Sequence, residues 1–540
     1  MDKNTLLAII LSLAVIIGYQ FLFAPPPQVK PPEPAAEKKA ETPVPAPVPA
    51  PVAVPVSSAA TTTDEKEIRV ENAFYSAVLS SKGGTIKSWE IKAYKDKKGQ
   101  DVILLKKPGV IPALSLGTSD AFDLAAIDFS VSGTDLKLDS NKTSGAIVFE
   151  YAREGVSIRR TYTFYADTYK VDISDEVSGL PGYWITLGSD FGIYENDASS
   201  GAFTGPALLK GTDLTEFVKG NLENLNFIER IWRGITGVKP KTDVTFAHDI
   251  KWIAREDKYF FAGLVPTDSH IEEGKAWETK DSVLIALKAK PGVNKFMLYA
   301  GPKEQKTLEK LNNGLEYIIN YGFFSIIARP LFWVLIFFHG FLGNYGWSII
   351  LLTIVTRLPF IPLLNKGQKS MRKLQALQPK MTEIREKYKK DPQKMQQEMS
   401  ELYKKHKVNP VGGCLPMLLQ IPVFFALYKV LLVSIELRGA PFILWITDLS
   451  APDALFGHIA GFSLGGPLPY LMGITMVLQQ KMTPSTMDPK QAKLMMLMPI
   501  IFTFMFLNFA SGLVLYWLVN NILGIIQQSF VNRKIANQPA

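Results

Sequence analysis

The sequence predicts a polytopic α-helical membrane protein that also carries a large soluble β-sandwich domain. Hydrophobic residues make up 47% of the 540 residues, and they concentrate at residues 5–23 and after residue 321. Residues 64–300 instead alternate apolar and polar residues, as half-buried strands do. A chain of this length is also expected to form more than one structural unit. Six membrane-spanning helices and one β-sandwich outside the cytoplasm account for these patterns.

The N-terminal apolar segment at residues 5–23 has no charged residue and is long enough to span a bilayer. A cleavable signal peptide is the alternative. Such a peptide needs a small-residue cleavage pattern, whereas this segment runs directly into three prolines at residues 25–27. We therefore expect residues 1–24 to be an uncleaved transmembrane anchor. Residues 25–63 are rich in proline and alanine, which favours a semi-rigid polyproline linker.

Residues 64–320 are expected to form the β-sandwich. Strand-like alternation is clear in IRVENAFYSAVLS, TIKSWEI, SIRRTYTFY and YKVDISDEV, and glycine-containing turns separate such stretches. Short strands with few helical patterns are typical of a sandwich. A helical segment near residues 303–319 is expected to close the domain.

Residues 321–344 are apolar but contain Arg329 and Pro330 near the centre. Proline interrupts a helix, and arginine is costly in lipid. We expect a broken amphipathic helix that lies in the membrane interface, with a membrane span as the alternative.

The C-terminal part, residues 345–535, contains five further apolar segments that could span a bilayer. They are residues 345–364, 415–435, 467–481, 494–510 and 512–530.

The charges of the loops predict the topology. The net charge of the chain is +9, and residues 366–407 alone hold thirteen Lys or Arg against five Asp or Glu. The loop at residues 436–466 has an acidic excess. Because basic loops remain in the cytoplasm, both termini are expected there, and residues 24–344 are expected largely outside.

The basic loop at residues 366–407 is predicted to be a helical hairpin. Apolar residues from Met371 to Tyr388 follow the spacing of a coiled-coil seam, and a second seam begins at Met395. Asp391 and Pro392 between them are typical of a helix start. The hairpin either docks an RNA-rich or acidic partner or is only a solvated loop that satisfies the charge rule.

Arg357 lies inside the segment at residues 345–364, and no acidic residue occurs in any of the five C-terminal segments. An arginine in hydrocarbon costs about 2.5–3.5 kcal/mol on insertion scales, so it needs water or polar partners. Neutral polar residues could surround it in a hydrated cavity that attracts anions or acidic peptides. An arginine that reaches the lipid headgroups is the alternative. The neutral candidates include Thr353, Gln420, Thr503, Asn508, Tyr516 and Asn520.

Lys429 is a second cation within a predicted span. Its place near the outer end of the segment predicts that its side chain reaches toward the interface. A single cysteine, Cys414, excludes an intrachain disulfide and a cysteine metal cluster. We expect no metal and no cofactor, and no glycine-rich nucleotide loop is present.

Several motifs in order along the chain resemble the YidC family of membrane protein insertases in its Gram-negative form. They are GGTIKSWEI, WSIILLTIVTR, LQPKMTEIREKY, KVNPVGGCLPMLLQIPVFFALY, ELRGAPFILWITDLS, LMPIIFTFMF and SGLVLYWLVNNILGIIQQ. The resemblance implies a five-helix core around a hydrophilic groove that is open to the cytoplasm and to lipid. It places the family's positive charge on Arg357 and groove-lining positions on Thr353, Tyr516 and Trp517.

The resemblance also implies a function. It predicts an insertase and folding chaperone of the bacterial inner membrane, not an enzyme, that acts alone or with the Sec translocon. Implied partners are nascent membrane proteins, the lipid bilayer and translating ribosomes, without sequence-specific nucleic acid binding. Two alternatives stay open: a transporter that binds an anionic solute at Arg357, and a carbohydrate enzyme, because the family's periplasmic fold resembles galactose mutarotase. Fold alone does not give activity.

Overall fold

The computed structural model describes residues 65–96, 99–106, 109–194, 202–217, 244–280, 282–406, 408, 415–459, 462–482 and 496–536. Thr63–Ala540 form one compact unit. The predicted anchor at residues 1–24 and the predicted linker at 25–63 lie outside the described residues.

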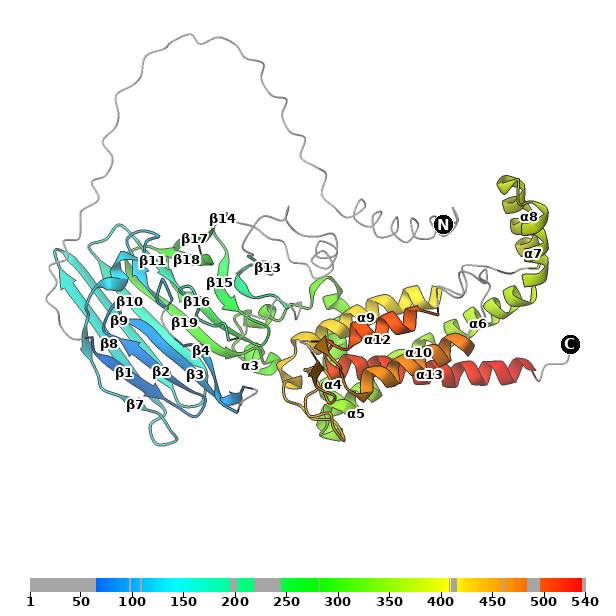
Figure 1. Ribbon diagram of the computed structural model, residues 1–540. Helices are drawn as coiled ribbons and strands as arrows, with labels where there is room; N and C mark the ends of the chain where they lie inside the picture. The colour runs from blue at the N-terminus through cyan, green and yellow to red at the C-terminus, as the bar shows by residue number, and fades with distance from the viewer. Residues whose placement is uncertain are drawn as a thin grey trace, which may run out of the picture. The chain divides into compact units, whose positions relative to one another are not determined.

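A nine-stranded sheet is the largest element of the β domain (Figure 1). Its neighbouring strands are antiparallel, and the sequence alternation of β9 and β10 places every second side chain in the interior. In sheet order the strands are β13 (Asp213–Glu216), β12 (Gly205–Lys210), β15 (Ile250–Glu256), β16 (Phe260–Asp268), β19 (Gly292–Pro302), β10 (Lys170–Ser178), β9 (Val156–Tyr165), β8 (Ser144–Arg153) and β6 (Ser130–Ser132).

Two five-stranded sheets complete the β domain. One contains β4 (Asp101–Leu105), β3 (Thr85–Lys95), β2 (Tyr75–Ser80), β1 (Glu67–Glu71) and β7 (Leu136–Lys137), and β7 pairs with β1 in parallel. The other contains β14 (Val244–Phe246), β17 (Ile271–Glu278), β18 (Val283–Ala289), β11 (Tyr183–Thr186) and β5 (Leu116–Gly117). A short 3-10 helix, η1 (Asp123–Ala126), follows β5. The predicted β-rich domain is confirmed.

One hydrophobic core joins the three sheets, with Trp89, Tyr162 and Ile185 among its fully buried members. Inside this core Arg160 and Asp175 form a fully buried ion pair, with Nε–Oδ1 and Nη2–Oδ2 distances of 2.7 Å. The remaining Nη1 group donates to Leu114 O at 2.6 Å. A charge is tolerated in such a core only when its hydrogen bonds are made this completely.

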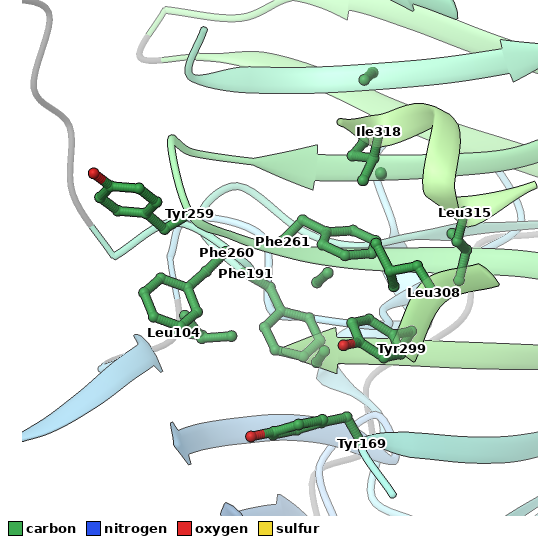
Figure 2. Close-up of a cluster of buried hydrophobic side chains, with 14 of the residues drawn as sticks. Leu104, Tyr169, Phe191, Tyr259, Phe260, Phe261, Tyr299, Leu308, Leu315 and Ile318 are labelled. Carbon is green, nitrogen blue, oxygen red and sulfur yellow. The ribbon is translucent and has the colours of Figure 1, made fainter. Parts of the chain in front are cut away.

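The helical segment predicted to close the β domain is split in two, α3 (Gln305–Lys310) and η4 (Leu315–Ile318). Asn312 and Gly314 between them both adopt positive φ, which ends the first helix. Figure 2 shows Leu308, Leu315 and Ile318 from this segment beside Phe261 and Tyr299 of the sheet. Trp252 Nε1 also donates to Gly314 O at 3.0 Å, which fixes the segment on the nine-stranded sheet.

The helical part follows the β domain, and Figure 1 shows α9, α10, α12 and α13 running alongside one another. Its acidic loop at residues 436–466 contains a small hairpin of β20 (His458–Ile459) and β21 (Phe462–Ser463). The helices are η5 (Gly322–Phe324), α4 (Ser325–Leu342), α5 (Tyr345–Arg357), η6 (Leu358–Phe360), α6 (Ile361–Ala376), α7 (Gln378–Lys387), α8 (Pro392–Lys405), α9 (Leu415–Val433), η8 (Ile435–Leu437), α10 (Pro467–Met482), α12 (Met498–Phe506) and α13 (Ser511–Ala536).

The expectation that Pro330 breaks the helix at residues 321–344 is wrong, because α4 is continuous from Ser325 to Leu342. Pro330 lies only five residues after the helix start, so a single backbone hydrogen bond beyond the free first turn is lost. Arg329 lies over the ring of Tyr317 at 5.3 Å instead of in an apolar environment. The helix packs one face against α5 and α9 and leaves Trp333 among the exposed apolar residues of its other face.

The predicted span at residues 345–364 is part of a longer helical path. Tyr345–Ala376 is helical throughout, with a 3-10 turn at Leu358–Phe360. Pro359 and Pro362 lack N–H groups, so the regular α-helical hydrogen bonds are interrupted directly after Arg357.

The predicted helical hairpin is present as α7 and α8, and Asp391 caps α8 by accepting from Lys394 N at 3.1 Å. Its small core contains Leu374, Leu377 and Met381, with residues of α8 packed against them. The first arm is interrupted between α6 and α7, beside Pro379.

Apolar side chains are exposed on the helical part, for example Ile474 on α10, Phe504 on α12 and Phe530 on α13. An apolar surface of this kind is suited to lipid. Among the described residues, three stretches are long and apolar enough to cross a membrane: Gly322–Leu342, Tyr345–Ala376 and Ser511–Arg533. Gln420–Val433 is shorter, and the predicted number of six spans is not confirmed.

Replacing Asp175 by asparagine should destabilise the β domain by roughly 3–5 kcal/mol, because the Arg160 guanidinium would remain buried without a counter-charge. Asp268→Asn is the matched control, since its pair with Lys295 is exposed and should contribute less than about 1 kcal/mol. Thermal unfolding followed by near-UV circular dichroism measures both. Equal unfolding temperatures for the two variants would contradict the structural role of the buried pair.

Candidate functional site

Arg357 is the last residue of α5, and the start of this helix is fixed by Asn344. The Asn344 side chain accepts hydrogen bonds from Gly346 N at 2.9 Å and Trp347 N at 3.2 Å. Its amide group also donates to Pro441 O and Phe442 O, at 3.2 and 3.1 Å. This cap fixes the start of α5 and joins the helix to the acidic loop.

The guanidinium of Arg357 is held by α13, 163 residues further along the chain. Nη1 donates to the backbone oxygen of Asn520 at 2.8 Å and also to the Asn520 side-chain oxygen. Nη2 makes a longer contact of 3.4 Å with Gln527 Oε1. These acceptors are all neutral.

Within the described part of the chain, Arg357 makes no ion pair with a carboxylate. Its Nε atom is buried and has no hydrogen-bond partner among those residues. A buried donor without a partner costs about 1–3 kcal/mol, more when the group is charged. The site therefore holds a positive charge that the described residues do not neutralise.

Arg357 lines a small pocket with seven other residues. Helices α5, α6, α9 and α13 and the 3-10 turn η6 contribute them, and the polar side chains are partly buried except for Tyr516, which is buried. The cavity volume is about 10 Å³, which is room for about one water molecule. The lining consists of Thr356, Arg357, Phe360, Leu364, Gln420, Val423, Tyr516 and Asn520.

Further polar contacts continue along α13 beyond the pocket. Gln527 Nε2 donates to Asn365 Oδ1 at 2.8 Å, and Gln528 Nε2 donates to Met482 O at 2.9 Å. Gln368 Nε2 donates to Gln528 Oε1 at 2.9 Å. Sequence reasoning missed these residues. The sequence feature that could have revealed them is the spacing of seven residues between Asn520 and Gln527, which places both side-chain amides on one face of the helix.

Of the residues predicted from the sequence, the structure brings four together in the pocket: Arg357, Gln420, Tyr516 and Asn520. Three others lie elsewhere. Thr353 is buried and donates to Ile349 O of its own helix at 2.6 Å. Thr503 donates to Pro499 O at 2.7 Å within α12, and Asn508 is exposed between α12 and α13.

Trp517 lies in an aromatic cluster instead of beside Arg357. Its ring centroid is 4.8 Å from Phe424 of α9, and 5.9 and 5.1 Å from Phe502 and Phe506 of α12. One helical step of about 100° separates Trp517 from Tyr516, so the two side chains leave α13 in different directions. The cluster joins α9, α12 and α13 by apolar contact.

The expectation that Lys429 reaches toward the interface is wrong, because the residue is buried and only 8% of its surface is exposed. It lines a cavity of about 30 Å³ with Glu216, Asn320 and Val433. Burial raises the pKa of Glu216, while the Asn320 amide, which donates to Glu216 Oε1 at 2.8 Å, acts in the opposite direction. The carboxylate provides a nearby opposite charge for the lysine, which makes a reach toward the headgroups unnecessary.

Comparison with known proteins identifies the family. The family described as the YidC periplasmic domain matches residues 67–334, and the family described as the 60Kd inner membrane protein matches residues 337–538. A membrane protein insertase YidC from Pelobacter propionicus is 38% identical over 99% of this chain and 100% of its own length. The chain belongs to the YidC family. The resemblance inferred from the sequence motifs is therefore confirmed.

A second relative of the same name, from Geobacter sulfurreducens, is 38% identical. The match covers 100% of this chain and 100% of the relative. Among solved structures, a crystal structure of an active YidC insertase is 19% identical with a TM-score of 0.36. It covers 86% of this chain and 92% of its own.

A cysteine in place of Thr356 should react with a polar maleimide, because this residue lines the pocket of this YidC family member. A cysteine in place of Leu352 should not react, because that side chain is fully buried one turn earlier in α5. Cys414, the one native cysteine, is first replaced by serine. Labelling is measured by the mass shift of protein in lipid vesicles. Equal reactivity at the two positions would show that the pocket is not accessible to water.

Proposed function

We propose that this protein inserts newly made proteins into the bacterial inner membrane and assists their folding, and that Arg357 receives the polar or acidic part of each client. The observation that carries this proposal is a guanidinium with neutral acceptors only among the described residues and a buried Nε donor without a partner. Membership of the YidC family, whose curated relatives are named insertases, supports the same function.

The physical difficulty of insertion is the transfer of polar groups into the membrane. A polar group without a hydrogen-bond partner costs roughly 2–7 kcal/mol in an apolar environment. The positive charge of Arg357 would attract a carboxylate or carbonyl of the client, and the neighbouring amides of Gln420 and Asn520 offer further partners. The site therefore lowers the transfer cost without forming a covalent intermediate.

The driving force comes from the client itself. Each CH₂ group that leaves water for an apolar environment contributes about 0.8 kcal/mol. A client's apolar segment would move sideways into lipid once its polar end is accommodated near Arg357. No nucleotide hydrolysis is required for this step, and the protein is not an enzyme in this proposal.

The finer assignments follow the charge pattern. Both termini and the α7–α8 hairpin are placed in the cytoplasm, and the β domain is placed outside. Exposed basic residues of the hairpin, such as Lys389, Lys390 and Lys394, would contact translating ribosomes, and the protein would act alone or beside the Sec translocon.

A transporter for an anionic solute is the second candidate, since an intramembrane arginine could bind an anion. The curated relatives favour insertion, because they are named membrane protein insertases. Photocrosslinking from Val423 to stalled nascent chains separates the candidates. Crosslinks to nascent membrane proteins support insertion, whereas binding of a small anion without such crosslinks supports transport.

Arg357→Ala should reduce insertion roughly tenfold, because it removes charge-assisted hydrogen bonds to the client. Arg357→Lys should retain most of the activity, since a positive charge is needed more than the planar guanidinium. Depletion of the native protein and rescue by each variant, with insertion followed by protease protection, measures the effect. The amounts of variant in the membrane serve as control. An Arg357→Ala variant as active as the native protein would refute the role of the charge.

Asn520→Asp should impair insertion about as strongly as Arg357→Ala, because it places a carboxylate within hydrogen-bonding distance of Nη1 and neutralises the arginine. Asn520→Leu is the matched control, since it removes the side-chain acceptor and leaves the charge free. It should retain more activity than Asn520→Asp in the same protease-protection assay. The reverse order would mean that the amide, and not the free charge, is what clients require.

A further inference from the structure

The face of α13 that receives Arg357 contains a residue without a side chain. Asn520, Gly524 and Gln527 are spaced by four and three residues, so they lie on one face of the helix. Asn520 and Gln527 both accept from the guanidinium, and buried Gly524 lies between them. Glycine is a poor helix former, so its position inside a helix of 26 residues requires a reason.

The guanidinium occupies the space that a side chain at position 524 would need. A Cβ atom added to Gly524 would lie 3.2 Å from Arg357 Nη2. It would also lie 2.6 Å from Nε2 and 3.2 Å from Cδ of Gln479 on α10. Ordinary carbon contacts begin near 3.5 Å, so both neighbouring side chains would have to move.

We propose that Gly524 is a positioning residue for Arg357: its missing side chain forms a seat in which the guanidinium lies against α13 between Asn520 and Gln527. The seat fixes where the positive charge lies in the pocket. It also directs Nη1 and Nη2 toward α13, so that Nε is the donor left without a partner. This inference rests on the proposed function, because the position of the charge matters for insertion only if clients use it.

Close packing of α10 against α13 is the rival explanation for the glycine, because the Gln479 contact is the tighter of the two. The explanations differ in one respect. If Gly524 acts through the guanidinium, the effect of a methyl group at position 524 depends on which residue occupies position 357. If it serves helix packing only, the effect is independent of position 357.

The experiment uses a field-sensitive probe in the full-length protein. Val423 lines the same pocket as Arg357, so it is replaced by cysteine in a Cys414→Ser chain and cyanylated. The stretching frequency of the nitrile then reports the electric field of the nearby cation. Arg357→Ala calibrates the full shift that loss of the charge produces.

Gly524→Ala should shift the nitrile frequency by a clear fraction of the shift that Arg357→Ala causes, because the guanidinium is displaced from its seat. The same substitution should cause no shift in a chain that already carries Arg357→Ala. Gly512→Ala is the matched control on α13. Its added methyl group would meet Leu449 O at 3.1 Å and Ile349 Cδ1 at 3.3 Å, which matches the 3.2 Å contact with Arg357 Nη2 in closeness but involves no charged atom. It should leave the frequency unchanged.

Insertion provides a second measurement. Gly524→Ala should reduce insertion in the chain with Arg357 and reduce it less in the Arg357→Lys chain, because the narrower ammonium tolerates the methyl group. If Gly524→Ala does not accumulate in the membrane, Gln479→Ala is added to remove the tighter contact, and the same two measurements are made.

An unchanged nitrile frequency in Gly524→Ala, or an equal shift with arginine and with alanine at position 357, would overturn the proposed seat. The proposed function fails separately, when Arg357→Ala inserts clients as well as the native protein. In that case the nitrile shift still decides whether Gly524 positions the guanidinium.

Discussion

The structure depends on how one guanidinium is accommodated among apolar helices. Arg357 reaches across to α13 and is held by neutral oxygens of Asn520 and, at longer range, Gln527. Because a charge in apolar surroundings is costly without partners, these contacts constrain how α5 and α13 lie against each other. The Asn344 cap fixes the start of α5, and the lack of a side chain at Gly524 leaves space for the guanidinium on α13.

Arg160 and Arg357 illustrate different uses of the same residue. Arg160 in the β domain is completely buried, and its guanidinium is paired bidentately with Asp175 and bonded to a backbone oxygen. Its charge is fully neutralised, so it can stabilise one arrangement of the strands and nothing else. Arg357 has no carboxylate among the described residues and keeps one buried donor free. In the proposed function, this charge is the one that receives the polar part of a client.

Local pattern predicted much of this fold correctly. The strands, the capped hairpin of α7 and α8, and the membership of the YidC family all followed from short-range spacing or motifs. The errors share one cause. The sequence does not show that Pro330 lies near a helix start, or that Glu216 lies near Lys429. Both depend on neighbours or boundaries that periodicity does not reveal.

The sequence by itself determined that a positive charge lies inside an apolar segment and that no carboxylate occurs in any predicted C-terminal span. Only the tertiary structure decided which polar residues meet that charge. Gln420, Tyr516 and Asn520 come to it, whereas the Thr503 hydroxyl donates within its own helix and Trp517 packs against other helices. The reason is physical: a helix repeat shows which residues share a face, but the partner of that face is set by packing between segments 163 residues apart.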